Sequence, residues 1–160
     1  MEKIEVIKQK IFDRDDLERK LAFWRFKTRK IVFTNGCFDV LHRGHVEYLA
    51  QARDKGDVLF VGLNTDASVR RLKGAGRPIN PQQARAMVLA SLFFVDAVVL
   101  FDEDTPYKLI KTIQPDVLVK GADYKPEDIV GYDIVTAKGG TVETIDLVEG
   151  FSTTKIVEWK

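Results

Sequence analysis

Apolar runs alternate with amphipathic segments along most of this chain. Because the runs are short and almost continuously apolar, they predict strands buried on both faces, at Ile31–Thr34, Val58–Leu63, Ala97–Phe101, Val117–Lys120 and Thr141–Ile145. Helical spacing predicts helices between and after them, at His45–Lys55, Pro81–Ser91, Thr105–Ile113, from about Pro126 and from Ser152. This strand–helix alternation predicts the α/β class, a Rossmann-like doubly wound parallel sheet in a single domain.

An extra amphipathic helix is predicted before the first strand, from about Asp15 to Phe26. It places Leu17, Leu21 and Trp24 on one side, so it either caps the sheet or makes a dimer contact. We therefore divide the chain into an N-terminal helical extension, residues 1–27, and one domain, residues 28–160. A length of 160 residues suits one compact domain.

The segment after the first strand carries both histidines of the chain. An Asn-Gly turn leads into a helix that opens with His42, Gly44 and His45. At a helix N-terminus, free backbone N–H groups and the helix dipole favour phosphate, and the two histidines, one turn apart, add side-chain donors. Gly44 removes a side chain that would keep a ligand off the backbone. The pattern predicts a phosphate site.

Charge and composition narrow the classes of partner. The net charge is +1, which gives no general attraction to nucleic acid or to a membrane surface, so a small molecule is the expected partner. One cysteine cannot form an internal disulfide, the charged N-terminus is no signal peptide, and no apolar run is long enough to span a bilayer. We expect a cytoplasmic protein, and a homodimer is the default assembly for soluble enzymes.

Several separated motifs resemble the HxGH nucleotidylyltransferases, most closely their heptose 1-phosphate adenylyltransferase branch. The resemblance covers about residues 28–160, in order and with similar spacing. It is carried by Phe38-Asp39, His42-x-Gly44-His45, Asn64-Thr65-Asp66, Arg71-Leu72-Lys73-Gly74-x-x-Arg77-Pro78, Arg85, Val119 to Tyr124, and Gly150 to Ile156. Relatives in this branch carry a sugar-kinase half before the matching region. Since only residues 1–27 precede it here, we expect a stand-alone transferase.

The resemblance implies transfer of AMP from ATP to D-glycero-β-D-manno-heptose 1-phosphate, giving ADP-heptose and pyrophosphate for the lipopolysaccharide inner core. Such chemistry needs position and charge more than a nucleophilic side chain, because the attacking phosphate is already an anion. The implied catalytic residues are His42 and His45 on the α-phosphate and Lys73, on a glycine-rich loop, over the leaving group. Mg²⁺ is the expected cofactor, with Asp39 or Asp123 as ligands.

The predicted topology brings these motifs together, since parallel strands end at one edge where ligands bind. We expect the nucleotide to contact Thr34, Asn35, Gly36, Cys37, Phe38, Gly44, Asp66, Arg85, Gly121, Asp123, Gly150, Ser152 and Thr153. Within this set Asp66 is expected at the ribose, and Arg85, Ser152 and Thr153 at the β- and γ-phosphates. Asp39, Arg77, Lys120 and Tyr124 are expected to bind the sugar phosphate.

Other interpretations compete with this one. Glycerol-3-phosphate cytidylyltransferase also carries a Ser-Thr-Thr-Lys-Ile run after its last strand, and a non-catalytic nucleotide sensor is a second class. A zinc site at Asp39, His42 and His45 lacks further Cys or His ligands to close it. A nucleophilic Cys37 lacks an evident orienting group. Residue types alone do not separate ATP from CTP.

Overall fold

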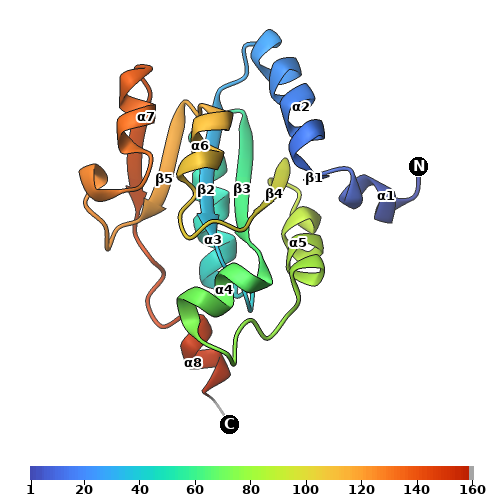
Figure 1. Cartoon of the computed structure of the whole chain (residues 1–160), viewed down its shortest axis with the longest axis vertical. Coiled ribbons are helices and arrows are strands. Elements are labelled where there is room, and N and C mark those ends of the chain that lie inside the picture. Colours follow the sequence, from blue (N-terminus) through green and yellow to red (C-terminus); the bar gives the residue numbers. More distant parts are fainter. Residues whose placement is uncertain (159–160) are drawn as a thin grey trace.

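The computed structural model describes residues 1–158, which form a six-stranded sheet with all neighbours parallel, in the order β1-β4-β3-β2-β5-β6 (Figure 1). The strands are β1 Ile11–Phe12, β2 Ile31–Gly36, β3 Val58–Asn64, β4 Ala97–Phe101, β5 Val117–Gly121 and β6 Thr141–Ile145. The predicted fold class is confirmed, and the five predicted strands lie within two residues of their expected bounds.

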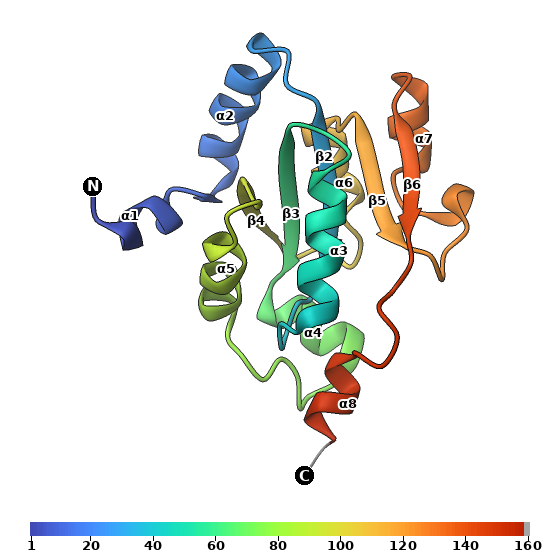
Figure 2. The same cartoon turned by 180° about the vertical axis from the view of Figure 1, so that it is seen from behind.

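Helices cover both faces of the sheet. The longer ones are α2 Arg14–Phe26, α3 Arg43–Arg53, α4 Asp66–Lys73, α5 Gln82–Ser91 and α6 Tyr107–Ile113; the shorter ones are α1 Lys3–Lys8, η1 Pro126–Asp128, α7 Tyr132–Ala137 and α8 Thr153–Val157. Two buried clusters form the core. One packs α3 and α5 against the sheet (Figure 2), and the other packs α2, α6 and α7 against the opposite face (Figure 1).

The N-terminal helix covers the sheet, which was the first of its two predicted roles. Leu17 and Leu21 of α2 are buried, and the ring of Trp24 meets Phe60 of β3 edge-on with centroids 5.0 Å apart. The chain before α2 forms β1, which pairs with β4 at the sheet edge. Residues 1–27 therefore contribute both a strand and a covering helix to the same sheet.

The sequence prediction missed two short elements, α1 and β1, and one longer helix, α4. A strand of two residues is too short to show a period. Helix α4 carries Arg70, Arg71 and Lys73 on its exposed side and buries only Ser68 and Val69, so it has the composition of a basic loop. The prediction that Lys73 lies on a glycine-rich loop was wrong, because Lys73 is the last residue of α4.

The sheet has one switch point, between β2 and β5. From β2 the chain builds outward through β3 to β4, and then crosses over to β5 and β6 on the other side of β2. At such a point the connections leave toward opposite faces of the sheet, which opens a crevice beyond the carboxyl ends of the strands. The loops after β2 and β5 border this crevice.

Candidate active site

A cavity of about 440 Å³ lies at this switch point. It is lined by the loop after β2, the start of α3, the end of β5 and the segment leading into α8. Most of the predicted site residues line it, namely Asn35, Gly36, Cys37, Phe38, Asp39, His42, Gly44, His45, Lys73, Lys120, Gly121, Asp123, Tyr124, Ser152 and Thr153. The volume falls in the ~300–1,000 Å³ range of small-molecule sites.

The two histidines stand together at the N-terminus of α3. His42 is the N-cap residue, and its backbone N–H donates to Nδ1 of His45 across 3.3 Å. The two imidazole rings stack with centroids 3.8 Å apart, and Phe38 meets the edge of the His45 ring at 5.2 Å. Since Nδ1 of His45 accepts a hydrogen bond, the neutral ring carries its proton on Nε2, where it can be donated to a ligand.

Gly44 lets the rings approach the backbone. A Cβ at this position would lie 2.9 Å from Cε1 of His42 and 3.2 Å from Cβ of Phe151. Both contacts are tighter than ordinary van der Waals distances, so a side chain here would displace the His42 ring. The glycine therefore fixes the histidine geometry, besides leaving room for the ligand.

Both histidines are held neutral. Burial lowers the pKa of His42, and burial, together with the neighbouring His42 and Lys73, lowers the pKa of His45 to about 4. Protonation of His45 would also place a proton on Nδ1, against the backbone N–H of His42. Near pH 7 both rings can therefore act as neutral hydrogen-bond donors.

We expect the low pKa of His45 to make the fold sensitive to mild acid. Between the ordinary histidine pKa of 6.5 and about 4, the unfolded chain binds a proton at His45 and the folded chain does not. Stability should fall as pH is lowered through this window. Thermal melting from pH 7 to 4 measures the loss, which should be smaller in His45→Gln.

The pKa of each histidine can be measured directly by nuclear magnetic resonance, because the chain has only two histidines. The ring C–H signals of each one give its own titration curve. A His45 midpoint near 6.5 would contradict the buried, neutral ring.

Positive charge reaches the cavity from two sides. Lys73 is exposed at the end of α4, and Lys120 of β5 is largely buried, with Nζ donating to the carbonyl of Asn35 at 3.3 Å. Burial lowers the pKa of Lys120, with Cys37 and Asp123 opposing the shift. Burial raises the pKa of Cys37 although Lys73 and Lys120 oppose it, so a neutral thiol is favoured and a thiolate nucleophile is not.

Asp39, predicted to bind metal or substrate, lines the cavity, and its carboxylate is engaged by protein groups. Its buried carboxylate accepts from Nε of Arg77 at 2.6 Å and from the backbone N–H groups of Ile79 and Asn80 at 2.8 and 3.0 Å. Burial alone would raise its pKa, but these donors outweigh burial and hold the pKa below its ordinary value. Asp39 thus links the loop after β2 to the loop after α4. Arg77, which was also predicted to bind the sugar phosphate, forms part of this link through its ion pair with Asp39.

Arg85 and Asp66 also differ from their predicted roles. The guanidinium of Arg85 is buried and donates to the carbonyls of Asn80, Cys37 and Asn64 at 2.7–2.9 Å and to Oδ1 of Asp66 at 2.7 Å. Neither residue lines the cavity. In this structure Arg85 therefore binds protein oxygens and fixes the segments that border the site, and its contact with phosphate stays a prediction.

Removing the Arg85 guanidinium should lower the free energy of unfolding and have a much smaller effect on nucleotide binding. Arg85→Ala leaves buried carbonyls and the Asp66 carboxylate without their donor, and breaking such a buried ion pair costs ~3–5 kcal/mol. Urea denaturation measures the loss, with Gln83→Ala, exposed on the same helix, as the control. Unchanged stability together with a raised KM for ATP would restore the phosphate role.

Four further predicted residues take specific positions. Thr34, predicted to contact the nucleotide, is buried within β2, where its hydroxyl pairs with the Tyr48 hydroxyl at 2.8 Å, and it does not line the cavity. Ser152 caps α8 by accepting from the backbone N–H of Lys155, and Thr153 donates to the carbonyl of Val40 at 3.3 Å. Gly150 lies before α8 with φ +85° and does not line the cavity.

The cavity also contains residues that were not predicted, namely Tyr48, Leu147, Val148, Phe151 and Thr154. Phe151 lies near-parallel to His42 at 6.3 Å, and the Arg43 guanidinium lies 5.8 Å from the Phe151 ring centroid. An aromatic residue directly before the predicted Ser152 cap was the signal that the sequence offered for Phe151. Leu147 and Val148 gave no signal, because only the tertiary fold brings Leu147 beside Gly121 and both residues into the cavity lining.

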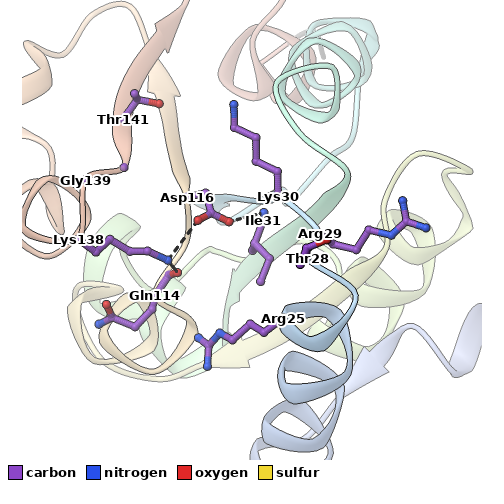
Figure 3. Close-up of a pocket in the computed structure, with 11 residues that line it drawn as sticks. Arg25, Thr28, Arg29, Lys30, Ile31, Gln114, Asp116, Lys138, Gly139 and Thr141 are labelled. Atoms are coloured by element: carbon purple, nitrogen blue, oxygen red, sulfur yellow. Dashed lines mark hydrogen bonds and ion pairs between the residues drawn. The ribbon is translucent and has the colours of Figure 1, made fainter.

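A second large cavity, of about 550 Å³, lies at the amino ends of β2 and β5 (Figure 3). Asp116 accepts there from the backbone N–H of Ile31 at 2.8 Å and pairs with Lys138 at 3.2 Å. Figure 3 shows Arg25 and Arg29 pointing in different directions, so the basic groups do not converge. The convergent polar groups lie at the opposite end of the sheet, with the histidines.

Sequence comparison agrees with this placement. Residues 33–158 match the family described as cytidylyltransferase-like, from β2 to the end of the described chain. The chain belongs to this family. The predicted resemblance and the predicted nucleotidyltransferase activity are thereby confirmed.

Curated relatives of this cytidylyltransferase-like chain are bifunctional proteins. It is 57% identical over 149 residues to the "Bifunctional protein HldE" of Syntrophotalea carbinolica and 59% identical over 144 residues to that of Nitrobacter hamburgensis. These matches cover 93% and 90% of this chain but only 30% and 29% of the relatives. The chain thus spans about a third of their length.

Two solved structures share the fold. A lipopolysaccharide core biosynthesis protein from Thermoplasma volcanium is 28% identical with a TM-score of 0.61, covering 75% of this chain and 97% of that one. A pantoate-beta-alanine ligase from Francisella tularensis, 16% identical with a TM-score of 0.59 over 92% and 75% of the two chains, shows likeness of fold alone. Within residues 1–158, no helix has the length and apolar character needed to cross a bilayer.

Proposed function

We propose that this cytidylyltransferase-like chain transfers AMP from ATP to D-glycero-β-D-manno-heptose 1-phosphate, giving ADP-heptose and pyrophosphate for lipopolysaccharide synthesis. Identity of 55–59% to bifunctional HldE proteins over at least 90% of the chain carries the choice of substrates. The likeness to a lipopolysaccharide core biosynthesis protein supports the same pathway.

The site geometry supports transfer at the α-phosphorus of the nucleotide. An oxygen of the sugar phosphate attacks this phosphorus, the bond to the bridging β-phosphate oxygen breaks, and pyrophosphate leaves with the electron pair. The acceptor is already an anion, so no proton must be removed from it. Nε2–H of His45 and the ring of His42 donate to α-phosphate oxygens as charge shifts toward the leaving group.

Lys73 and Lys120 supply the fixed positive charge that the transition state needs. The charge of Lys73, at the end of α4, reaches both His45 and Cys37: it adds to the lowering of the His45 pKa and opposes the rise that burial causes in the Cys37 pKa. Lys120 is held against the Asn35 carbonyl and beside the Tyr124 ring, 5.7 Å from its centroid. We assign Lys73 to the leaving pyrophosphate and Lys120 to the incoming phosphate.

We expect Mg²⁺ to be bound mainly by the triphosphate, with few ligands from the protein. The Asp39 carboxylate is engaged by Arg77 and two backbone N–H groups, which leaves Asp123 as the carboxylate at the cavity from the predicted pair. Among residues 1–158, no group of three or more His, Cys, Asp and Glu is arranged to hold a metal. Asp123 would therefore hold the ion with ATP supplying most ligands, and the ion would neutralise phosphate charge.

A pyrophosphate-release assay tests the proposed reaction. Four nucleoside triphosphates are combined with a panel of sugar and polyol phosphates under matched Mg²⁺ and pH. We expect ATP with heptose 1-phosphate to exceed CTP with glycerol 3-phosphate by at least ~10²-fold in kcat/KM, because a heptose pocket leaves donors unpaired when a three-carbon acceptor enters.

The other outcomes separate the competing functions. Faster turnover of CTP with glycerol 3-phosphate would assign the glycerol-3-phosphate cytidylyltransferase reaction and reject the heptose proposal. No pyrophosphate from any combination, with ATP still bound, would indicate a nucleotide sensor.

A further inference from the structure

The loop after β4, residues 102–104, runs along one side of α4. It accepts hydrogen bonds at three places on this helix: from the hydroxyl of Thr65 at the N-cap, from the hydroxyl of Ser68 at 3.4 Å, and from the guanidinium of Arg71 in the last turn. Positions three apart in sequence are neighbours on one face of a helix. The loop therefore binds a single face of α4 from its start to its last turn.

Lys73 lies on the side of α4 that faces away from this loop. An α-helix turns by about 100° per residue, so Lys73 is rotated by about 200° from Arg71. Arg71 contacts the loop, and Lys73 lines the histidine cavity. Because the two residues are on opposite sides of one helix, a movement of α4 away from the loop also moves Lys73 relative to the histidines.

The last turn of α4, residues 70–73, is held by polar contacts more than by packing. The buried residues of α4 are Ser68 and Val69, both in its first half. Within residues 1–158, Arg71 is the one side chain of the last turn that makes a hydrogen bond, and it makes two. Its Nε donates to Oδ1 of Asp104 at 3.0 Å, and its Nη2 donates to the carbonyl of Asp102. The position of this turn therefore depends on Arg71.

The ion pair between Arg71 and Asp104 is too exposed to stabilise the whole fold appreciably. The two side chains are 45% and 70% exposed, and such pairs contribute little to global unfolding. A helix end opens locally at a much smaller cost in free energy than the whole domain. The same pair therefore has its main effect on whether the last turn stays formed and docked. The loop is held in turn by the N-terminal extension, since Arg14 pairs with Glu103 at 2.9 Å.

We propose that Asp104 is a positioning residue, which holds Arg71 and with it the last turn of α4, so that Lys73 meets the leaving pyrophosphate. This inference rests on the proposed function and adds to it a residue that acts through Lys73. None of the site residues predicted from the sequence lies in the loop after β4, so the loop has no other assigned part in the reaction.

The charge of Asp104 makes the proposal testable by the sign of an effect. Asp104 and Lys73 both line a cavity of about 400 Å³ that shares Lys73 and Lys120 with the histidine cavity. Removal of a carboxylate there makes the surroundings of the phosphates more positive, which by charge alone would favour the transition state. Loss of the position of Lys73 would have the opposite effect and slow the reaction.

Steady-state kinetics of Asp104→Asn tests this, with the nucleotide and acceptor that wild type turns over fastest in the pyrophosphate-release panel. We expect kcat to fall ~5-fold with the KM for the nucleotide within twofold, which is the factor that an exposed ion pair can supply. Thermal melting should match wild type. Asp104→Glu keeps the carboxylate and should recover most of kcat. Glu127→Gln removes an equal charge from exposed η1 and should behave as wild type.

A double variant shows whether the effect passes through Lys73. In a Lys73→Ala background, Asp104→Asn should lower kcat no further, because the two residues then act as one unit. A further loss in that background, or a kcat of Asp104→Asn at or above wild type, would overturn the positioning role and leave the proposed reaction intact. If the fastest pair is CTP with glycerol 3-phosphate and both kinetic results hold, the heptose proposal fails and the positioning role stands. If wild type turns over no pair, both fail.

Discussion

Replacement of His45 by alanine is expected to lower kcat by ~10²–10³-fold, about 3–4 kcal/mol of transition-state stabilisation. The reason is the single proton on Nε2, which is directed to the ligand because Nδ1 accepts from the His42 backbone. His42→Ala should produce a similar loss, since the two rings stack at 3.8 Å and serve the same phosphate. Single-turnover rates at saturating ATP and acceptor measure the effect.

The control for this experiment lies on the same helix. Gln51 is exposed on α3, away from the cavity, so Gln51→Ala should retain wild-type turnover and melting. The double variant of both histidines should lose little more than either single one, because residues that act as a unit are not additive. A folded single variant with near-normal kcat would remove that histidine from the catalytic set.

Lys73→Ala is expected to lower kcat by ~10²-fold while changing the KM for ATP much less. Lys73 ends α4, and the following Gly74 has φ +99° and, like Gly76, no neighbour within 4 Å of an added Cβ. The lysine therefore stands at the rim of the cavity, where it meets the pyrophosphate as negative charge develops on it. Steady-state kinetics with varied ATP separates the two parameters.

Arg70, exposed on the same helix, supplies the matched control for Lys73. Arg70→Ala removes an equal charge from α4 and should leave kcat within twofold. If Lys73→Ala raises only the KM for ATP, Lys73 binds the ground state and has no special role at the leaving group. Equal losses in both variants would indicate a general effect of positive charge on α4.

Sequence alone predicted the strands and the histidine motif because both signals are local. A buried parallel strand such as Val117–Gly121 is apolar at nearly every position, whatever its neighbours are. The turn, the glycine and the two histidines lie within one short segment after β2, so their arrangement follows from the start of one helix. The convergence of the loops after β2 and β5 also followed from the alternation of strands and helices.

The roles of the charged residues were decided by the tertiary structure. Asp39, Arg77 and Arg85 were predicted to bind ligands, and in this structure each hydrogen-bonds protein groups 19–48 positions away along the chain. Nothing in a local pattern distinguishes an arginine that binds phosphate from one that binds carbonyl oxygens, because both present the same donors.

The layout of the site likewise depends on the fold. The sequence determined that a helix N-terminus carrying both histidines follows β2, and that strand ends gather around it. Only the tertiary structure placed Lys73 at the end of a helix and buried Arg85 among carbonyl oxygens. The physical reason is that periodicity reports which face of an element is buried, whereas a cavity depends on which distant elements stop short of one another.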